Sequence, residues 1–391
     1  MINRRQFLKA SGAALACYHL PLSAQQSSNQ RFIWVMLRGA MDGLSALVPY
    51  ADPNYAKLRE SIAIPSPAGS NTAIKLDGLF ALHPELSALA NWYTQGDLIA
   101  FPAVSSAYRE RSHFDGQNLM ENGGVRPYEQ KDGWLNRALQ LMDNKSGLAI
   151  GSSVPTVMQG SFEVESWSPS ILSAPDDDIY QRLTDLYSSD DMLASRLDSL
   201  LNTRDTLMSM EGDMSAGRST GIQAFAQMID TASKLLAVDN GPQVATLELG
   251  GWDTHSGQGG ITGRLANQFR GLNSGLLRLK EGLGDKWANT TLVVMTEFGR
   301  TMKINGTNGT DHGTASTAFV AGGAVKGGRI LGDWPGLAQS DLYEGRDLMP
   351  TLDNRAILKG LLASQFGLSE AQLAEIIFPG SGEIAPVEGL V

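Results

Sequence analysis

Four short apolar runs, each rich in β-branched or aromatic residues, constrain the fold of this 391-residue chain most strongly. Helical-looking stretches separate the runs, and this alternation predicts a sheet of buried parallel strands with helices on both faces. The runs are RFIWVML at 31–37, DLIAFPAV at 97–104, QVATLEL at 243–249 and TLVVMTEF at 291–298. A fifth run, STAFVAGG at 316–323, is expected to join this sheet. The fold class is therefore α/β with a mostly parallel central sheet.

The first 24 residues have the features of a twin-arginine export signal. Arg4 and Arg5 precede FLK, a mildly apolar stretch follows, and the segment ends in small residues. The apolar stretch is shorter than the roughly 20 residues that cross a bilayer, so no stable membrane insertion is expected. We expect export to the periplasm, with a basic cytosolic N-terminus as the alternative. Cys17 lies in this segment within ALAC, where lipidation is a minor alternative.

The rest of the chain, 25–391, is expected to form a single domain. Between about 176 and 238 it becomes acidic and helical, with Leu and Met at helical intervals. This pattern predicts a helical insertion whose apolar stripe packs internally rather than holding a cofactor. Two helices are predicted near the C-terminus, and the tail after Pro379 is expected to be loose.

Charge and cysteine content exclude several classes of function. Removing the three basic residues of the signal takes the formal net charge from −10 to −13. An acidic surface repels nucleic acid and anionic lipid, so neither is an expected partner. The only cysteine is Cys17, so the mature protein has neither disulfides nor zinc–thiolate sites.

Carboxylates and imidazoles lie at successive strand ends. They are Asp42 after the first strand, Asp253 and His255 after the third, Glu297 and Arg300 at the end of the fourth, and Asp311 and His312 before the fifth. Parallel sheets build their ligand sites where these loops converge. Neutral imidazole with carboxylate is a ligand set of catalytic divalent metals. One Asp/His pair alone is as often a hydrogen-bonded turn, but the two glycine-flanked pairs with the other carboxylates favour a metal site.

A serine opens a predicted helix in SHFDGQNLMEN. At a helix N-terminus, partial positive charge would favour an anionic nucleophile, which makes Ser112 a candidate catalytic residue. Ser112 and Asp115 also have capping-box spacing, and we weigh the two interpretations equally. His113 is either a site residue or a buried neighbour, and His83 is expected to be structural.

Several motifs together resemble a known family. LRGAMDGLSALVPY, RSHFDGQNLMENG, GGWDTH, MTEFGRT and DHGT are similar to motifs of the exported bacterial domain-of-unknown-function family fifteen-oh-one, from about Arg31 to the C-terminal helices. That family is grouped with the alkaline phosphatase and sulfatase-like fold, whose members hydrolyse phosphate or sulfate esters with two neighbouring metals. The resemblance therefore implies an alkaline phosphatase-like fold and a metal-dependent ester hydrolase.

The resemblance also implies roles for individual residues. Asp253, His255 and His312 would bind one metal, and Asp42, Glu297 and Asp311 would serve the second. Phe298 stands where the superfamily has a histidine, so the second position keeps only oxygen ligands, which suit magnesium, calcium or manganese better than zinc. Divalent ions are thus the expected cofactors.

The sequence favours a periplasmic hydrolase of phosphate or sulfate esters, acting on a small-molecule or polymer ester. Ser112 or a water would be the nucleophile, and Arg300 would clamp the anion or form a surface salt bridge. The alternative is a non-catalytic exported protein that binds a protein partner during assembly. A serine hydrolase using Ser219 of GRSTG is a distant third, because no strand is predicted before that motif.

Overall fold

The computed structural model describes residues 29–391 except 144, 152, 169–176 and 210–220, so the predicted export signal and Ser219 lie outside the described residues. A nine-stranded sheet forms the centre, with the order β11-β5-β10-β9-β1-β8-β6-β7 and with β12 paired to β5. Its strands are β1 (Arg31–Arg38), β5 (Leu98–Ser105), β6 (Gly147–Ile150), β7 (Glu165–Trp167), β8 (Val244–Gly250), β9 (Thr290–Thr296), β10 (Ser316–Ala321), β11 (Arg329–Ile330) and β12 (Leu352–Asp353). All five predicted strands are present.

The sheet is mostly parallel, as predicted. β1 pairs in parallel with both β8 and β9, and β6 continues the parallel array beyond β8. β10 is the exception, because it pairs antiparallel with β5 and β9. The chain returns from β9 to β10 through 297–315 without the helix that usually connects neighbouring parallel strands.

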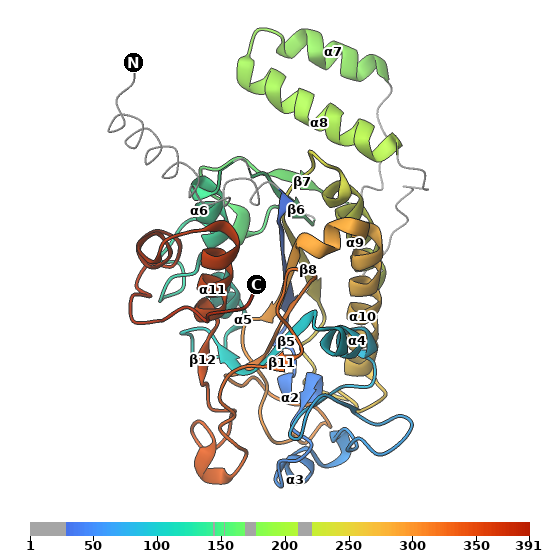
Figure 1. The fold of residues 1–391 in the computed structure, drawn as a ribbon, viewed down its shortest axis with the longest axis vertical. Coiled ribbons are helices and arrows are strands. Elements are labelled where there is room, and N and C mark those ends of the chain that lie inside the picture. Colours follow the sequence, from blue (N-terminus) through green and yellow to red (C-terminus); the bar gives the residue numbers. More distant parts are fainter. Residues whose placement is uncertain (1–28, 144, 152, 169–176, 210–220) are drawn as a thin grey trace, which may run out of the picture.

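Helices cover both faces of the sheet (Figure 1). Alternate residues of β1 enter two cores: Ile33 and Val35 pack with residues of α4, α9 and α10, whereas Phe32 and Trp34 pack with residues of α5, α6 and α11. The helices are α2 (Gly43–Ala46), α3 (Tyr55–Arg59), α4 (Ser87–Gln95), α5 (His113–Asn122), α6 (Trp134–Leu141), α7 (Asp177–Tyr187), α8 (Asp191–Ser209), α9 (Ile222–Ala237), α10 (Arg264–Leu283) and α11 (Asn354–Phe366). This arrangement confirms the predicted α/β class.

Short elements complete the fold. A small antiparallel sheet contains β2 (Leu47–Val48), β4 (Ala81–Leu82) and β3 (Ile74–Lys75). Short 3-10 and π segments are η4 (Glu60–Ile62), η5 (Thr156–Met158), η6 (Gly284–Asn289), η7 (Gln339–Asp341) and η8 (Gln372–Ile377). Within the described residues, no helix is both long and apolar enough to cross a membrane.

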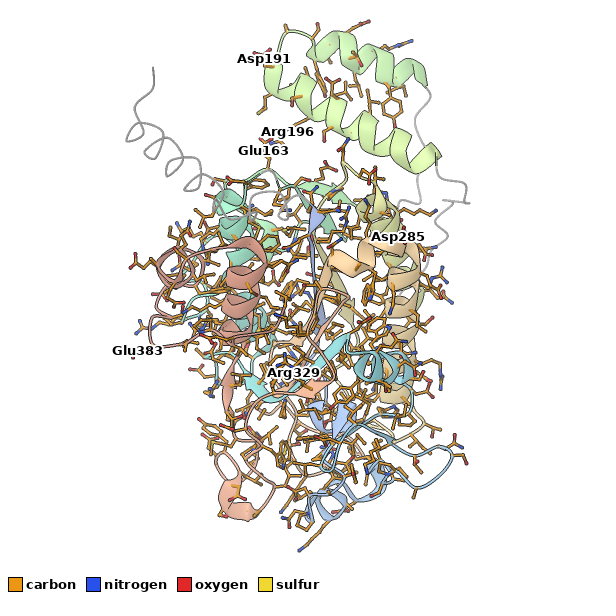
Figure 2. All side chains as sticks on the ribbon, in the orientation of Figure 1. Glu163, Asp191, Arg196, Asp285, Arg329 and Glu383 are labelled. Carbon is orange, nitrogen blue, oxygen red and sulfur yellow. The ribbon has the colours of Figure 1, made fainter. Side chains whose placement is uncertain are left out.

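The described part of the region predicted as a helical insertion contains three helices. α9 packs with the body, where Phe225 and Ile229 are buried in one core. In Figure 1, α7 and α8 stand apart above the sheet. An exposed ion pair of 2.8 Å joins Arg196 on α8 to Glu163 just before β7 (Figure 2). The division into one domain with an insertion at about 176–238 stays a prediction.

The C-terminal tail is docked on the body, so the expectation of a loose tail is wrong. The Val387 amide donates to the Ala356 carbonyl at 2.9 Å, and the Leu390 side chain is fully buried. Gly360 makes this contact possible, because a Cβ at that position would lie 1.9 Å from the Val387 carbonyl oxygen. A glycine inside a helix therefore marks a packing site for the tail.

Candidate metal centre

The loops after three adjacent strands meet at one edge of the sheet. β9, β1 and β8 are neighbours in register, so Glu297, Gly39 and Asp253 follow strand ends that lie side by side. Gly39 has a φ of 117°, and a Cβ there would lie 2.7 Å from the Asp253 amide nitrogen. A glycine is required because only a residue without a side chain combines this backbone conformation with this close approach.

Asp253 lies among three histidine rings, each with its Nε2 atom near the carboxylate. Its Oδ1 is 3.1 Å from His255 Nε2 and 3.3 Å from His312 Nε2, and its Oδ2 is 3.6 Å from His113 Nε2. Ligand atoms of His113, Asp253 and His312 all lie within 4.8 Å of one another, and this group could hold a metal ion. The rings come from α5, the loop after β8 and the loop before β10.

Each histidine is oriented through its other ring nitrogen. The Nδ1 contacts are His113 to Glu297 Oε1 at 2.8 Å, His255 to Asp311 Oδ1 at 3.1 Å and His312 to the Arg111 carbonyl at 2.9 Å. All three partners are acceptors, so each Nδ1 carries a proton, and each Nε2 has a lone pair available to a metal when its ring is neutral. Carboxylate or carbonyl partners of this kind accompany most metal-binding histidines.

Two observations show that the residues fit a cation. His113 Nε2 is buried and has no hydrogen-bond partner among the described residues. His255 Nε2 and His312 Nε2 are 2.9 Å apart, and both lie beside the Asp253 carboxylate. A metal ion could use the lone pairs of both nitrogens when the two rings are neutral. A buried acceptor without a donor likewise needs a partner.

The ionisation states also suit metal binding. Desolvation opposes the Asp253 carboxylate, but hydrogen bonding and charge from Arg300 outweigh it and lower the pKa of Asp253. Burial and the neighbouring His113 lower the pKa of His312. Burial also opposes the imidazolium of His113, yet the hydrogen bond to Glu297 prevails and raises the pKa of His113. At neutral pH, Asp253 is therefore an anion and His312 is neutral.

Glu297 lies behind His113 rather than within the metal-binding group. Its Oε1 accepts from the Gly39 amide at 2.8 Å and from Gln117 Nε2 at 2.9 Å, in addition to His113. Its Oε2 accepts from the Thr296 hydroxyl at 2.9 Å. The side chain is fully buried, so both oxygens are committed to protein donors.

Asp42 also lies outside this group. It forms a buried ion pair with Arg59 and accepts from Ser45 Oγ at 2.9 Å and Gln258 Nε2 at 2.6 Å. Burial, followed by repulsion from Arg300, lowers the pKa of Arg59 to about 9, which leaves Arg59 charged at neutral pH. A fixed guanidinium thus stands beside the carboxylate that was predicted to bind a second metal.

Arg300 holds Asp253 in place. Its Nη1 donates to Asp253 Oδ1 at 2.6 Å, its Nε donates to Thr310 Oγ1 at 3.1 Å, and its Nη2 donates to the Thr310 carbonyl. The Arg300 side chain is fully buried, so the alternative of a surface salt bridge is wrong. Every donor nitrogen of the guanidinium already has a protein acceptor.

Ser112 begins α5, immediately before His113, as predicted. No side-chain capping hydrogen bond forms there, and the Asp115 carboxylate instead accepts from Tyr108 Oη at 3.1 Å. The predicted capping box is therefore wrong. The Ser112 amide donates to Tyr108 Oη at 3.2 Å, which ties the loop before α5 to its first turn.

Phe298 contacts the metal-binding group, whereas His83 is buried elsewhere in the fold. Phe298 stacks on His113 with ring centroids 5.0 Å apart, and both Phe298 and Glu297 pack against Gly116, where a Cβ would meet the Phe298 ring at 3.0 Å. His83 is fully buried, its Nε2 lies 3.1 Å from the Gly260 carbonyl, and burial lowers its pKa to about 4. His83 is therefore structural in this fold, as expected.

The sequence match to the family described as "Protein of unknown function (DUF1501)" extends over residues 29–377. The chain belongs to this family. The DUF1501 match includes every strand and every histidine described above. No curated protein is significantly similar to this DUF1501 chain in sequence.

Several solved structures of longer chains have a similar fold. i-CgsB in complex with a neocarrahexaose is 9% identical, with a TM-score of 0.46 and coverage of 91% of this chain and 77% of that one. The PsFucS1 sulfatase from Pseudoalteromonas sp. is 11% identical, with a TM-score of 0.41 and coverage of 96% and 74%. The C-terminal periplasmic domain of EptC from Escherichia coli, in complex with Zn, is 10% identical, with a TM-score of 0.37 and coverage of 74% and 72%.

Proposed function

We propose that this DUF1501 protein is an exported, metal-dependent hydrolase of phosphate or sulfate esters that holds one divalent ion at the edge of its sheet. The observation that carries the proposal is the buried, unpartnered Nε2 of His113, which faces Asp253 and His312. A metal ion would give this nitrogen a partner beside a carboxylate and a second imidazole.

We assign the ligands to Asp253, His113 and His312, with His255 as a fourth. Three imidazoles with one carboxylate suit zinc better than magnesium or calcium, which prefer oxygen ligands. His255 is 45% exposed, so it faces the open side of the group, where substrate would approach. A zinc ion there would act as a Lewis acid on a non-bridging ester oxygen and lower the pKa of water.

The surrounding residues would hold and orient these ligands. Glu297 and Asp311 would fix the rings of His113 and His255 through their Nδ1 protons, and Arg300 would keep Asp253 anionic and correctly placed. Ser112 stays the candidate nucleophile because it adjoins His113 at the positive end of α5. This assignment gives Glu297 and Asp311 orienting roles in place of direct metal binding.

A single ion is favoured over the metal pair that the superfamily resemblance implied. Arg59 supplies the positive charge beside Asp42, and a second cation there would have to displace a buried guanidinium. Ser45 and Gln258 also occupy the Asp42 carboxylate. We therefore propose that Asp42 and Arg59 form a structural pair.

An activity screen with a matched pair of variants tests the hydrolase proposal. Protein purified after native export is assayed against aryl phosphates, phosphodiesters and aryl sulfates. We expect turnover of at least one class, loss of that turnover in Asp253→Ala, and full retention in Asp285→Ala, whose exposed carboxylate lies in η6 (Figure 2). Metal-loaded protein without turnover on any class would reject the hydrolase.

A binding protein with a structural ion is the second candidate. It is favoured because Arg300, the candidate anion clamp, has every donor nitrogen committed to a protein acceptor. Metal removal separates the two candidates. For a purely structural ion, chelation lowers the melting temperature while the wild-type protein shows no turnover before or after reloading.

A further inference from the structure

An open cavity of about 420 Å³ lies beside the start of α5, next to the candidate metal centre. Its walls include Tyr108, Arg109, Glu110, Asp115, Arg126 and Tyr128. Tyr108 connects it to the centre, because its hydroxyl bonds both the Ser112 amide and the Asp115 carboxylate, on either side of His113. The cavity and the metal-binding group therefore share the first turn of one helix. Its volume is in the range of small-molecule sites.

Tyr128 is presented to this cavity at an energetic cost. Its φ is 61°, a left-handed conformation that bulky residues avoid, and its side chain is 62% exposed. The Tyr128 amide donates to Asn118 Oδ1 on α5 at 2.5 Å, which helps to hold this conformation. The exposed ring gains little from packing, and its hydroxyl bonds the Asp115 carboxylate on the cavity wall. Strained residues of this kind occur at ligand clamps.

Two basic and two acidic side chains surround the cavity, and one of each has no ion-pair partner among the described residues. Arg109 and Arg126 stand against Glu110 and Asp115. Arg109 Nη1 is committed to the carbonyl oxygens of Tyr108 and Ser106. Glu110 and Arg126 form no ion pair or side-chain hydrogen bond with any described residue. The cavity therefore offers one unused carboxylate and one unused guanidinium without a net charge.

This combination selects one class of ligand. Two carboxylates would repel an anion as much as two guanidiniums attract it, and a purely apolar ligand would leave the charges of Glu110 and Arg126 without partners. Adjacent hydroxyl groups, in contrast, can donate to Glu110 and accept from Arg126, each through paired hydrogen bonds. The C–H face of a pyranose ring can stack on the electron-rich face of Tyr128.

We propose that this cavity is a subsite for a neutral sugar ring, with Tyr128 as the stacking platform and Glu110 and Arg126 as the hydroxyl-binding pair. The subsite itself requires no metal. Because Asp115 on the cavity wall and His113 share the first turn of α5, the proposed function further implies that the hydrolysed ester is carried by a carbohydrate.

Binding of neutral oligosaccharides tests the subsite directly. Mature protein is titrated with cellohexaose, maltohexaose, xylohexaose and chitohexaose, and binding is followed by saturation-transfer NMR and calorimetry. We expect at least one hexasaccharide to bind, Tyr128→Phe to keep the affinity, and Tyr128→Ala to lose about five- to tenfold, the loss of one stacking contact. Glu110→Gln should also weaken binding. Tyr187→Ala, a tyrosine on α7, is the matched control and should bind like wild type.

Two further measurements distinguish loss of sugar binding from loss of folding and from loss of metal. Tyr128→Gly should lose sugar binding without a lower melting temperature, because glycine accepts the left-handed backbone. Sugar binding should persist after the metal is removed with EDTA, which separates the subsite from the metal proposal. Failure of all four sugars to bind, or undiminished binding by Tyr128→Ala, would overturn the subsite even if the protein hydrolyses simple esters.

Discussion

At the scale of single residues, Arg111 is an unusual support for His312, a proposed metal ligand. Its carbonyl oxygen accepts from His312 Nδ1, and its φ of 63° is a conformation that costs about 1–2 kcal/mol outside glycine. The Asp347 carboxylate, which is fully buried, binds Arg111 Nε at 2.8 Å and holds that backbone in place. Asp347 therefore influences His312 through one intervening residue.

Asp347→Asn should weaken zinc binding by about 10–100-fold, the usual effect of removing a group that orients a ligand. A competition titration with a chromophoric chelator measures this affinity. Glu344→Gln is the control, because Glu344 also pairs with Arg111 at 2.7 Å but is 58% exposed. Exposed pairs contribute little, so Glu344→Gln should stay within about twofold of wild type. Equal losses in both variants would contradict the positioning role.

The proton on His113 predicts how metal affinity changes with pH. The raised pKa of His113 means that its imidazole stays protonated to a higher pH than an ordinary histidine, and this proton competes with the metal. Affinity should rise with pH until it passes that pKa. Glu297→Gln removes the charge that stabilises the imidazolium, so the pKa of His113 should fall and the rise should shift to lower pH. A profile that shifts to higher pH in Glu297→Gln would contradict this explanation.

At the scale of elements, the approach of the β1 and β8 loops depends on Gly39. Gly39→Ala should destabilise the fold by at least about 1–3 kcal/mol, because the left-handed backbone alone carries that cost and the methyl group also meets the Asp253 backbone. Urea denaturation measures the change. Gly78→Ala should stay within about 0.5 kcal/mol, since a Cβ at Gly78 has no neighbour within 4 Å. Similar midpoints for both variants would refute a special requirement at Gly39.

The sequence predicts the main strands well, but it does not predict how the candidate metal-binding residues are surrounded. The five main strands are continuous apolar runs, and such runs predict buried strands without knowledge of their neighbours. Short strands such as β6 and β12 have no such length, and their pairing depends on neighbours distant in the sequence. His113 faces Asp253 only because α5 packs beside the loops of β8 and β9, so its environment could not be predicted from the residues around it. The Arg111 carbonyl, a backbone group, leaves no sequence signal at all.

At the scale of the whole molecule, export and folding are expected to be coupled. The twin-arginine pathway transports folded proteins, so the metal-binding group would form before export. Replacing Arg4 and Arg5 with Lys should leave the precursor inside the cell, as cell fractionation would measure. Undiminished export of that variant would contradict the proposed route, while leaving the metal centre untouched.

The number and the surroundings of the bound ions test the metal centre most directly. Elemental analysis of the natively exported protein gives the stoichiometry, and X-ray absorption at the metal edge gives the ligands. We predict one ion per chain, coordinated mainly by imidazole nitrogen with one carboxylate, and lost in Asp253→Ala. A folded chain without metal, or with an ion bound only by oxygen, would contradict the assignment of His113, Asp253 and His312.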